Sequence, residues 1–299
     1  NEAYDEYYTL IKGQCAPWIL EDENFMEYLL SHKCLQVFAE PLDGKGIQGI
    51  PPLKLQFDPD MPPVHRASCR HVPQEIRPII EAHMISYVDK QLFDWCKHPH
   101  ITSPTVITKK ATRPFFRVAI DYRWINQWVR MIQAHTPVIL DELYKAQGWE
   151  VFGDIDWTEA FHQVPLDPDT ADKLCVITTL GAIRPRFMME GVAPASSVLQ
   201  NVVQDVFHEV RNESICIFDN ILTGGTKTTL RERFIRIVDI CYERNIRLNF
   251  RKTFLGHNTA KYFGYELFGS PRSGFRIDAK RKSSLQDIPF PGHGSTKRE

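Results

Sequence analysis

Two short runs of β-branched and apolar residues meet at an acidic turn, and this pattern constrains the fold most strongly. The runs are residues 214–218 and 221–223, and they flank the dipeptide Asp219-Asn220. Two turn-forming residues between such runs predict a β-hairpin. A third run, residues 151–156, ends in Asp156 and leads straight into a predicted helix around Glu159. The sequence therefore predicts a sheet with one carboxylate at a strand end and another at a hairpin tip.

Hairpins also dominate the rest of the predicted structure, because residues 175–179 and 183–188 flank a turn at Gly181. Strands and helices interleave, with long helices predicted at 195–210 and 228–244, so the predicted class is α+β with an antiparallel sheet. The chain is predicted to begin with a helical extension (1–44), followed by an extended Pro-rich arm (45–73). The next segment (74–150) has a helix at 73–93 and strands at 105–108 and 116–121, and the one after it (151–268) has both acidic sites and a final strand at 262–268. A loose basic tail (269–299) ends the chain.

The charge is unevenly distributed along the chain. The net charge is −1, from 36 Lys+Arg and 37 Asp+Glu, which by itself argues against a nucleic-acid partner. However, residues 1–100 hold 9 basic and 15 acidic residues, whereas residues 227–299 hold 16 basic and 7 acidic residues. A basic C-terminal quarter can meet phosphates, an acidic membrane surface or an acidic protein, or it can be a solvated helix face.

The cysteines indicate a reducing, intracellular compartment, because there are seven of them and none forms a CxxC pair. The residues do not indicate an organelle. No run reaches the roughly 18 apolar residues of a membrane span. A zinc site is considered for one cluster but is not expected, because Pro99 interrupts it and its spacing matches no zinc finger. Its candidate ligands are His65, Cys69, His71, Cys96, His98 and His100.

The two acidic positions suit phosphoryl transfer. Carboxylates brought together from adjacent strands, such as Asp156 and Asp219, can bridge two Mg²⁺ ions about 3.5–4 Å apart, which activate an attacking hydroxyl and stabilise the leaving oxygens. Upstream, Lys110 and Arg117 flank a turn, where they could hold a triphosphate. Each feature alone is weak, since acidic residues at strand ends usually just face water.

Together and in this order the motifs resemble the reverse transcriptases of gypsy-type LTR retrotransposons. Residues 116–126 (Phe-Arg-Val-Ala-Ile-Asp-Tyr-Arg-Trp-Ile-Asn) resemble the fingers motif, and residues 156–164 (Asp-Trp-Thr-Glu-Ala-Phe-His-Gln-Val) resemble motif A. Residues 217–222 (Ile-Phe-Asp-Asn-Ile-Leu) stand where Y-x-D-D-I-L is expected. Residues 248–254 and 261–267 resemble the closing palm motif and the primer grip. The resemblance covers residues 45–298.

The resemblance implies a right-hand polymerase fold, with fingers at 74–150 and a palm at 151–268 that ends in a primer-grip-like hairpin. It also implies Mg²⁺, an RNA template and a DNA primer. By this resemblance, Asp156 and Asp219 are metal ligands, and Phe161 is a steric gate that selects deoxynucleotides. The implied contacts to the incoming nucleotide are Lys110, Arg117 and Gln200, of which Gln200 lies on the helix under the template. The implied primer grip is Phe263, Gly264 and Tyr265. For the aromatic residues the alternative is plain core packing.

The departures from the family pattern fall at the active site. Asn220 replaces the second Asp of Y-x-D-D, so one negative charge is lost. Glu190 stands where the family places Phe or Gln, and Asn-Ala-Pro of motif B is lost or shifted. Asp154 shares a strand face with Asp156, but the roughly 6.5 Å step between alternate strand residues makes it a poor replacement. The family continues into a thumb, a connection and RNase H, so the thumb is expected to be truncated or absent.

Two functions of different class follow. The favoured one is a catalytically degraded relative, retained as a structural or binding subunit among the protein subunits of a larger assembly. The alternative is an RNA-directed DNA polymerase that uses two-metal phosphoryl transfer and is impaired. A minor option is nucleic-acid binding without chemistry through residues 227–282.

Overall fold

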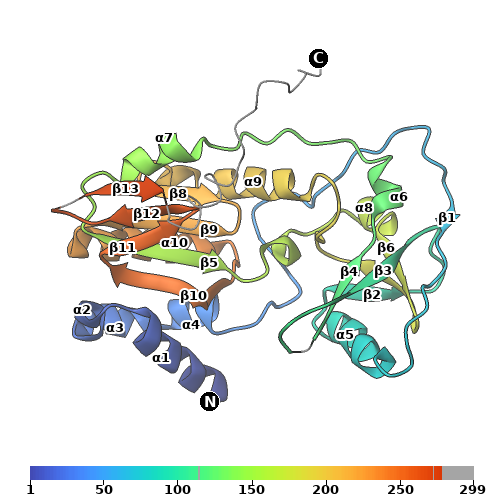
Figure 1. Cartoon of the computed structure of the whole chain (residues 1–299), viewed down its shortest axis with the longest axis horizontal. Coiled ribbons are helices and arrows are strands. Elements are labelled where there is room, and N and C mark those ends of the chain that lie inside the picture. Colours follow the sequence, from blue (N-terminus) through green and yellow to red (C-terminus); the bar gives the residue numbers. More distant parts are fainter. Residues whose placement is uncertain (114, 272, 278–299) are drawn as a thin grey trace, which may run out of the picture.

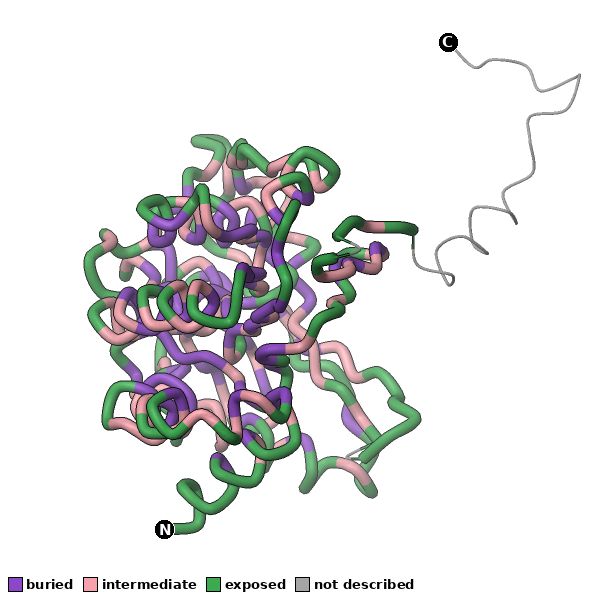
Figure 2. The backbone as a smooth tube through the Cα atoms, turned by 90° about the vertical axis from the view of Figure 1, so that its left-hand side faces the viewer, coloured by how far each residue is buried: buried purple, intermediate pink, exposed green. Residues whose placement is uncertain are grey.

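The computed structural model describes residues 1–113, 115–271 and 273–277. Within these residues the strands form three sheets, and the two larger ones lie in separate lobes (Figure 1). We call them the fingers sheet, the palm sheet and the C-terminal sheet. Figure 2 shows buried positions gathered in the interior of the molecule, while the outer turns are exposed.

The palm sheet has the strand order β10-β5-β9-β8. These strands are β5 (Val151–Trp157), β8 (Ser214–Ile217), β9 (Asn220–Gly225) and β10 (Leu248–His257), and all their pairings are antiparallel. The predicted hairpin is confirmed as β8–β9, but its turn lies one residue earlier than predicted, at Phe218-Asp219, because Asn220 already pairs with Ile217 as the first residue of β9. Helix α10 (Lys227–Glu243) packs against the sheet through the apolar residues Leu230, Phe234 and Ile237, which recur at helical spacing and are buried. The helix α9 (Ala195–Val206), followed by η3 (His208–Val210), and the pair α7 (Ile139–Leu143) and η1 (Tyr144–Ala146) complete this lobe.

The fingers sheet has the order β1-β3-β6-β7-β2, with β4 paired to β3. Its strands are β1 (His65–Arg66), β2 (Phe93–Cys96), β3 (Ile101–Lys109), β4 (Phe116–Ile120), β6 (Cys175–Thr178) and β7 (Gly181–Pro185), with helices α5 (Arg77–Asp89), α6 (Arg123–Asn126) and α8 (Pro168–Asp172) in the same lobe. The β6–β7 hairpin was predicted, but within the palm segment 151–268. Its strands instead pair with β3 and β2, because the chain leaves the palm after β5 and returns only at α9.

The helical extension packs beneath the palm. It consists of α1 (Glu2–Gln14), α2 (Pro17–Leu20), α3 (Glu23–Leu29) and α4 (His32–Phe38), and it contacts β10 and α10 (Figure 1). Tyr7 is almost fully buried; its hydroxyl donates to the carbonyl of Leu29, and its ring packs edge-on against Phe250 of β10. Such packing makes the extension part of the palm core.

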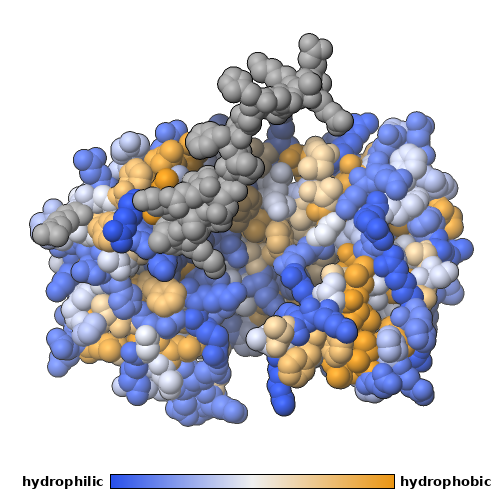
Figure 3. Space-filling view, in the orientation of Figure 1, coloured by the Kyte–Doolittle hydropathy of each residue, from blue (hydrophilic) through white to orange (hydrophobic). Residues whose placement is uncertain are grey.

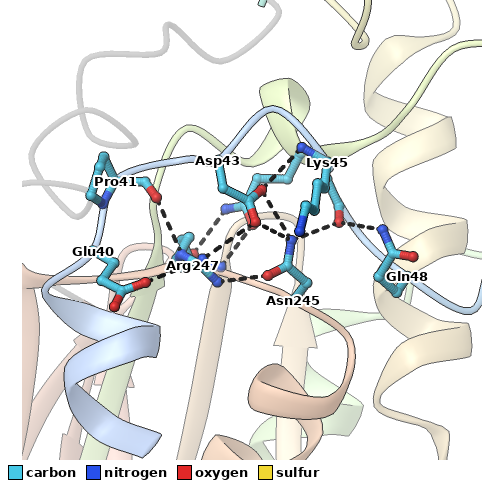
Figure 4. A network of polar contacts seen from close by, with 9 residues as sticks. Glu40, Pro41, Asp43, Lys45, Gln48, Asn245 and Arg247 are labelled. Carbon is cyan, nitrogen blue, oxygen red and sulfur yellow. Dashed lines mark hydrogen bonds and ion pairs between the residues drawn. The ribbon is translucent and has the colours of Figure 1, made fainter. Parts of the chain in front are cut away.

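The arm after α4 is fixed to the palm by a polar network around Arg247 (Figure 4). The Arg247 side chain is only 4% exposed and lies 3.7 Å from carboxylate oxygens of both Glu40 and Asp43. The Asn245 amide also donates to Asp43 at 3.1 Å. A buried guanidinium needs such charged partners. The arm then runs extended, as predicted, with its amide at Ile47 donating to Gln163.

The C-terminal part differs most from the prediction. The single strand predicted at 262–268 is two strands, β11 (Thr259–Tyr262) and β12 (Tyr265–Phe268), joined by a turn. Residues Gly274–Ile277, assigned to the loose tail, form β13, which pairs with β12 and places the Phe275 ring against Tyr265. The two-residue alternation of Phe275 and Ile277 supports a strand. The rest of the predicted tail, 278–299, lies outside the described residues.

Candidate active site

A cleft of about 1110 Å³ lies between the fingers and palm sheets. Figure 3 shows a hollow between the two lobes on the face of Figure 1. Its walls come from α5, β4, the end of β5, α9 and the β8–β9 turn. The cleft brings together five of the predicted site residues, which are Lys110, Arg117, Asp156, Phe161 and Asp219.

Strand β5 holds Asp156 at the centre of the palm sheet. Its neighbours across the sheet are Asn220 of β9 and Asn249 of β10. The Trp157 amide donates to the carbonyl of Asp219 at 2.9 Å, which ties the strand end to the hairpin tip. Both carboxylates line the cleft because this backbone hydrogen bond and the sheet register keep their segments adjacent.

The Asp219 turn is strained and is held from below by Gln200. Phe218 has a left-handed backbone with φ of 50°, which is costly for a residue with a side chain. The Gln200 oxygen accepts from the Phe218 amide at 2.8 Å, and its Nε2 donates to the Cys216 carbonyl at 3.2 Å. Gln200 is 0% exposed and does not line the cleft. The structure therefore places Gln200 beneath the hairpin rather than in the cleft, with both ends of its amide bonded to the hairpin backbone.

The two carboxylates line the same cleft and repel one another electrostatically. Burial, the Asp219 charge and the Asp154 charge raise the pKa of Asp156 to about 7, while Lys252 opposes the shift. Lys252 also lines the cleft. The unliganded site thus disfavours the ionised form of Asp156, and a cation held there would favour it.

Asn220 is turned toward Asp154 within the palm sheet. Its Nδ2 donates to Asp154 Oδ1 at 2.6 Å. Burial raises the pKa of Asp154, and the Asn220 hydrogen bond opposes the rise. Asp154 does not line the active cleft but a second cavity of about 510 Å³, between β10 and the C-terminal sheet. Asp154 thus lies outside the cleft and is joined to the hairpin by its hydrogen bond with Asn220.

The side of the cleft that holds Lys110 and Arg117 contains an ion pair. Arg117 Nη2 lies 2.9 Å from Glu190 Oε2, and both side chains are more than half exposed. Glu190 thus compensates the charge of Arg117. Lys110 lies at the β3–β4 turn, where its amide donates to the Phe115 carbonyl.

The turn after β5 presents Phe161 to the cleft. Glu159 has a left-handed backbone with φ of 38° and precedes η2 (Ala160–Gln163). The predicted helix here is this short 3₁₀ turn. Gln163 is fully buried and fixes the turn, because its Nε2 donates to the Thr158 and Arg247 carbonyls at 2.6 and 2.8 Å. Phe161 itself packs partly on the core.

The predicted primer-grip residues do not line the cleft. Phe263 (φ 46°) and Gly264 (φ 80°) form the β11–β12 turn, where Phe263 is 40% exposed. Tyr265 is buried at 8% exposure and packs on Phe275. For Tyr265 the core-packing alternative describes the observed contacts.

The donor set of the palm tip suits Mg²⁺, which prefers oxygen ligands and is commonly held by one or two carboxylates with substrate phosphates. Asp156 and Asp219 supply those carboxylates, and Asn220 Oδ1 is buried with no hydrogen-bond partner among the described residues. Within the same residues, no cluster of three or more His, Cys, Asp or Glu could hold a metal ion. Of the considered zinc ligands, His65 stacks on Trp124 with ring centroids 3.8 Å apart.

Comparison with known proteins adds an independent finding. No family model matches the chain. The Pol polyprotein of transposon 412 from Drosophila melanogaster is 23% identical over 221 residues, which are 71% of this chain and 18% of that protein. The Pol polyprotein of transposon gypsy from the same organism is 26% identical over 199 residues, covering 63% of this chain and 19% of that protein. The chain is a relative of LTR-retrotransposon reverse transcriptases.

The solved structures agree with this relationship at the level of fold. The foamy viral protease-reverse transcriptase in complex with an RNA/DNA hybrid superposes with a TM-score of 0.76 at 16% identity, covering 97% of this chain and 38% of that one. The same enzyme with double-stranded DNA gives a TM-score of 0.77 at 16% identity, with 97% and 58% covered. The predicted right-hand polymerase fold is confirmed. The chain spans less than a fifth of the two polyproteins.

Sequence reasoning missed Lys252 and Gln163 in this palm, and it named Gln200 but not its contacts with the hairpin. Lys252 follows Asn249 in the predicted closing motif, and its approach to Asp156 depends on the irregular β5–β10 pairing between Asn249 and Phe254. Gln163 and Gln200 are buried amides, and a polar residue in an otherwise apolar run was the available signal. No helix in the described parts of the chain has the length and apolar character needed to cross a membrane.

Proposed function

We propose that this reverse-transcriptase relative is catalytically degraded and serves as a structural or binding subunit of a larger assembly. The observation that carries the proposal is the hydrogen bond from Asn220 to Asp154, which leaves two carboxylates at the palm tip and a neutral amide in place of the third. The Arg117–Glu190 ion pair supports it, since a triphosphate must compete with Glu190 for that guanidinium. The free cysteines support an intracellular, reducing compartment.

An active RNA-directed DNA polymerase is the second candidate. The cleft supports it by gathering Lys110, Asp156 and Asp219 beside Phe161. In that case Mg²⁺ would be held by Asp156 and Asp219, and an RNA template and DNA primer would occupy the cleft. The foamy viral relatives with RNA/DNA hybrid and double-stranded DNA support nucleic acid as the partner class. Part of the minor candidate surface, 278–282, lies outside the described residues.

Primer extension separates the two candidates. A labelled DNA primer on an RNA template is incubated with Mg²⁺ or Mn²⁺ and deoxynucleotides, using wild type, Asp156→Ala and the control Glu232→Ala, an exposed acid on α10. The proposal expects wild type to extend no more primer than Asp156→Ala. Extension by wild type and Glu232→Ala that Asp156→Ala abolishes would establish the polymerase instead.

The subunit role has its own test. Tagged wild type and Asp156→Ala are isolated from the native cells, and the stoichiometry of copurifying proteins is measured. The proposal expects the same stoichiometric partners with both proteins, because the palm carboxylates take no part in assembly. A monomer with no stoichiometric partner contradicts it.

A further inference from the structure

Asp154 and Asn220 lie on one face of the palm sheet. Asp154 and Asp156 are two residues apart on β5, so their side chains project to the same side. Asn220 is the cross-strand partner of Asp156 and lies diagonally from Asp154. Side chains in these positions are within contact distance in an antiparallel pair. The three residues therefore form one polar group at the base of the hairpin tip.

The hydrogen bond between Asp154 and Asn220 fixes how the amide faces. An ionised carboxylate only accepts hydrogen bonds, so it selects the NH₂ end of the amide. Nδ2 is accordingly 2.6 Å from Asp154 Oδ1. Asn220 Oδ1 is then directed away from Asp154, and it is buried without a hydrogen-bond partner among the described residues. An unsatisfied buried oxygen is costly and calls for a partner.

We propose that Asp154 is a positioning residue that holds Asn220 so that its side-chain oxygen is a neutral third ligand for a divalent cation beside Asp156 and Asp219. The negative charge of the Asp154–Asn220 pair is on Asp154, which lies behind Asn220 as seen from the proposed cation. Mg²⁺ and Mn²⁺ accept amide oxygens, and the number of charged ligands tunes affinity. The resulting site binds the cation more weakly than three carboxylates do.

The pair also explains why the family carboxylate cannot simply be restored. An Asp at position 220 would offer only acceptors to the carboxylate of Asp154, so the hydrogen bond would be replaced by repulsion in a buried setting. Exchanging both residues, Asp154→Asn with Asn220→Asp, reverses the direction of the hydrogen bond and keeps the charge of the pair. It also places a carboxylate directly at the cation site.

The test uses the full chain at pH 8 and Mn²⁺ alone as the probe. Free Mn²⁺ is followed by its paramagnetic resonance signal, and thermal unfolding is followed without metal. We expect Asn220→Ala and Asp154→Ala each to weaken Mn²⁺ binding several-fold. Asn220→Asp alone should lower Tm by about 5 °C. The double exchange should restore Tm and bind Mn²⁺ about tenfold more tightly than wild type.

Two outcomes overturn the proposal. One is Mn²⁺ binding by Asn220→Ala equal to that of wild type, including the case in which neither binds. The other is a Tm of Asn220→Asp equal to that of wild type with no gain from the double exchange. If Asp154→Ala does not fold, Asp154→Asn keeps the hydrogen bond with Asn220 while removing the charge, and it should still weaken binding. Primer extension by wild type would refute the degraded-enzyme proposal and leave this one standing.

Discussion

Replacing Asp156 by Asn should stabilise the metal-free protein at pH 8. Burial and the nearby Asp219 carboxylate raise the pKa of Asp156 to about 7. In the unfolded chain the same group titrates near 3.9. A carboxyl whose pKa is raised by folding contributes fully below its unfolded pKa, and that contribution is lost as the pH rises through the folded value. Between about pH 4 and pH 7, ionisation of Asp156 therefore works against folding.

The size of the effect follows from the pKa difference. About three pKa units correspond to about 4 kcal/mol at 1.36 kcal/mol per unit. Asp156 is only half-buried at the cleft wall, so solvent screening reduces this to about 1–2 kcal/mol. For a chain of this size, that predicts a rise in Tm of about 2–6 °C for Asp156→Asn at pH 8. The difference should shrink steadily toward pH 4.

Thermal unfolding in the presence of EDTA from pH 4 to pH 8 measures this difference. Asp60→Asn is the matched control, because Asp60 is an exposed acid in the arm. Adding Mg²⁺ should then raise the Tm of wild type and leave Asp156→Asn almost unchanged, since a ligand stabilises only the form that binds it. A variant that is no more stable than wild type at pH 8, or equally shifted at pH 4, would refute the electrostatic reasoning.

Three further changes have defined outcomes. Glu190→Gln should strengthen binding of a fluorescent deoxynucleoside triphosphate about threefold to tenfold at low salt, because it frees Arg117 and removes a repulsive charge. The gain in affinity should shrink at 0.5 M salt, and equal affinity of wild type and variant in a fluorescence titration contradicts this prediction. Gln200→Ala should lower the free energy of unfolding by about 2–3 kcal/mol in urea titrations, since it leaves two buried backbone groups at the strained turn without partners. Arg247→Met should lower the free energy of unfolding by about 3 kcal/mol in the same titrations, because Asp43 loses its buried guanidinium partner. A loss below about 0.5 kcal/mol would refute a structural role for the Arg247 network.

Local patterns predicted the palm hairpin because its information lies within ten residues. The runs on either side of Asp219-Asn220 end at turn-forming residues, so the two strands and the hairpin follow from the sequence. The exact register does not, because Ile217 pairs with Asn220 and the turn lies at Phe218-Asp219. The same held for α10, whose apolar residues recur at helical spacing. The predicted approach of Asp156 to this hairpin relied on the family resemblance, and the β5–β9 register confirms it.

Pairings between distant segments could not be predicted in this way. The β6–β7 hairpin was recognised, but its partners β2 and β3 lie about 70–90 residues away, and nothing in its own sequence names them. Gln200 was assigned to the nucleotide because the family resemblance implies that role, and a polar residue on an amphipathic helix can face either a ligand or the protein interior. Its burial under the β8–β9 turn is set by the crossing of α9 and β8.

The loss of the second family carboxylate has a different meaning in the structure than in the sequence. Counted along the chain, Asn220 removes one negative charge and Asp154 stands too far along β5 to replace it. In the folded palm, Asn220 and Asp154 are joined by one hydrogen bond. A negative charge therefore remains next to the neutral amide, on Asp154. The Asp154 carboxylate would still attract a cation at the palm tip. In the proposed site, however, it does not coordinate the cation directly. The site proposed at the palm tip thus keeps an electrostatic attraction for a divalent ion while it has one direct charged ligand fewer.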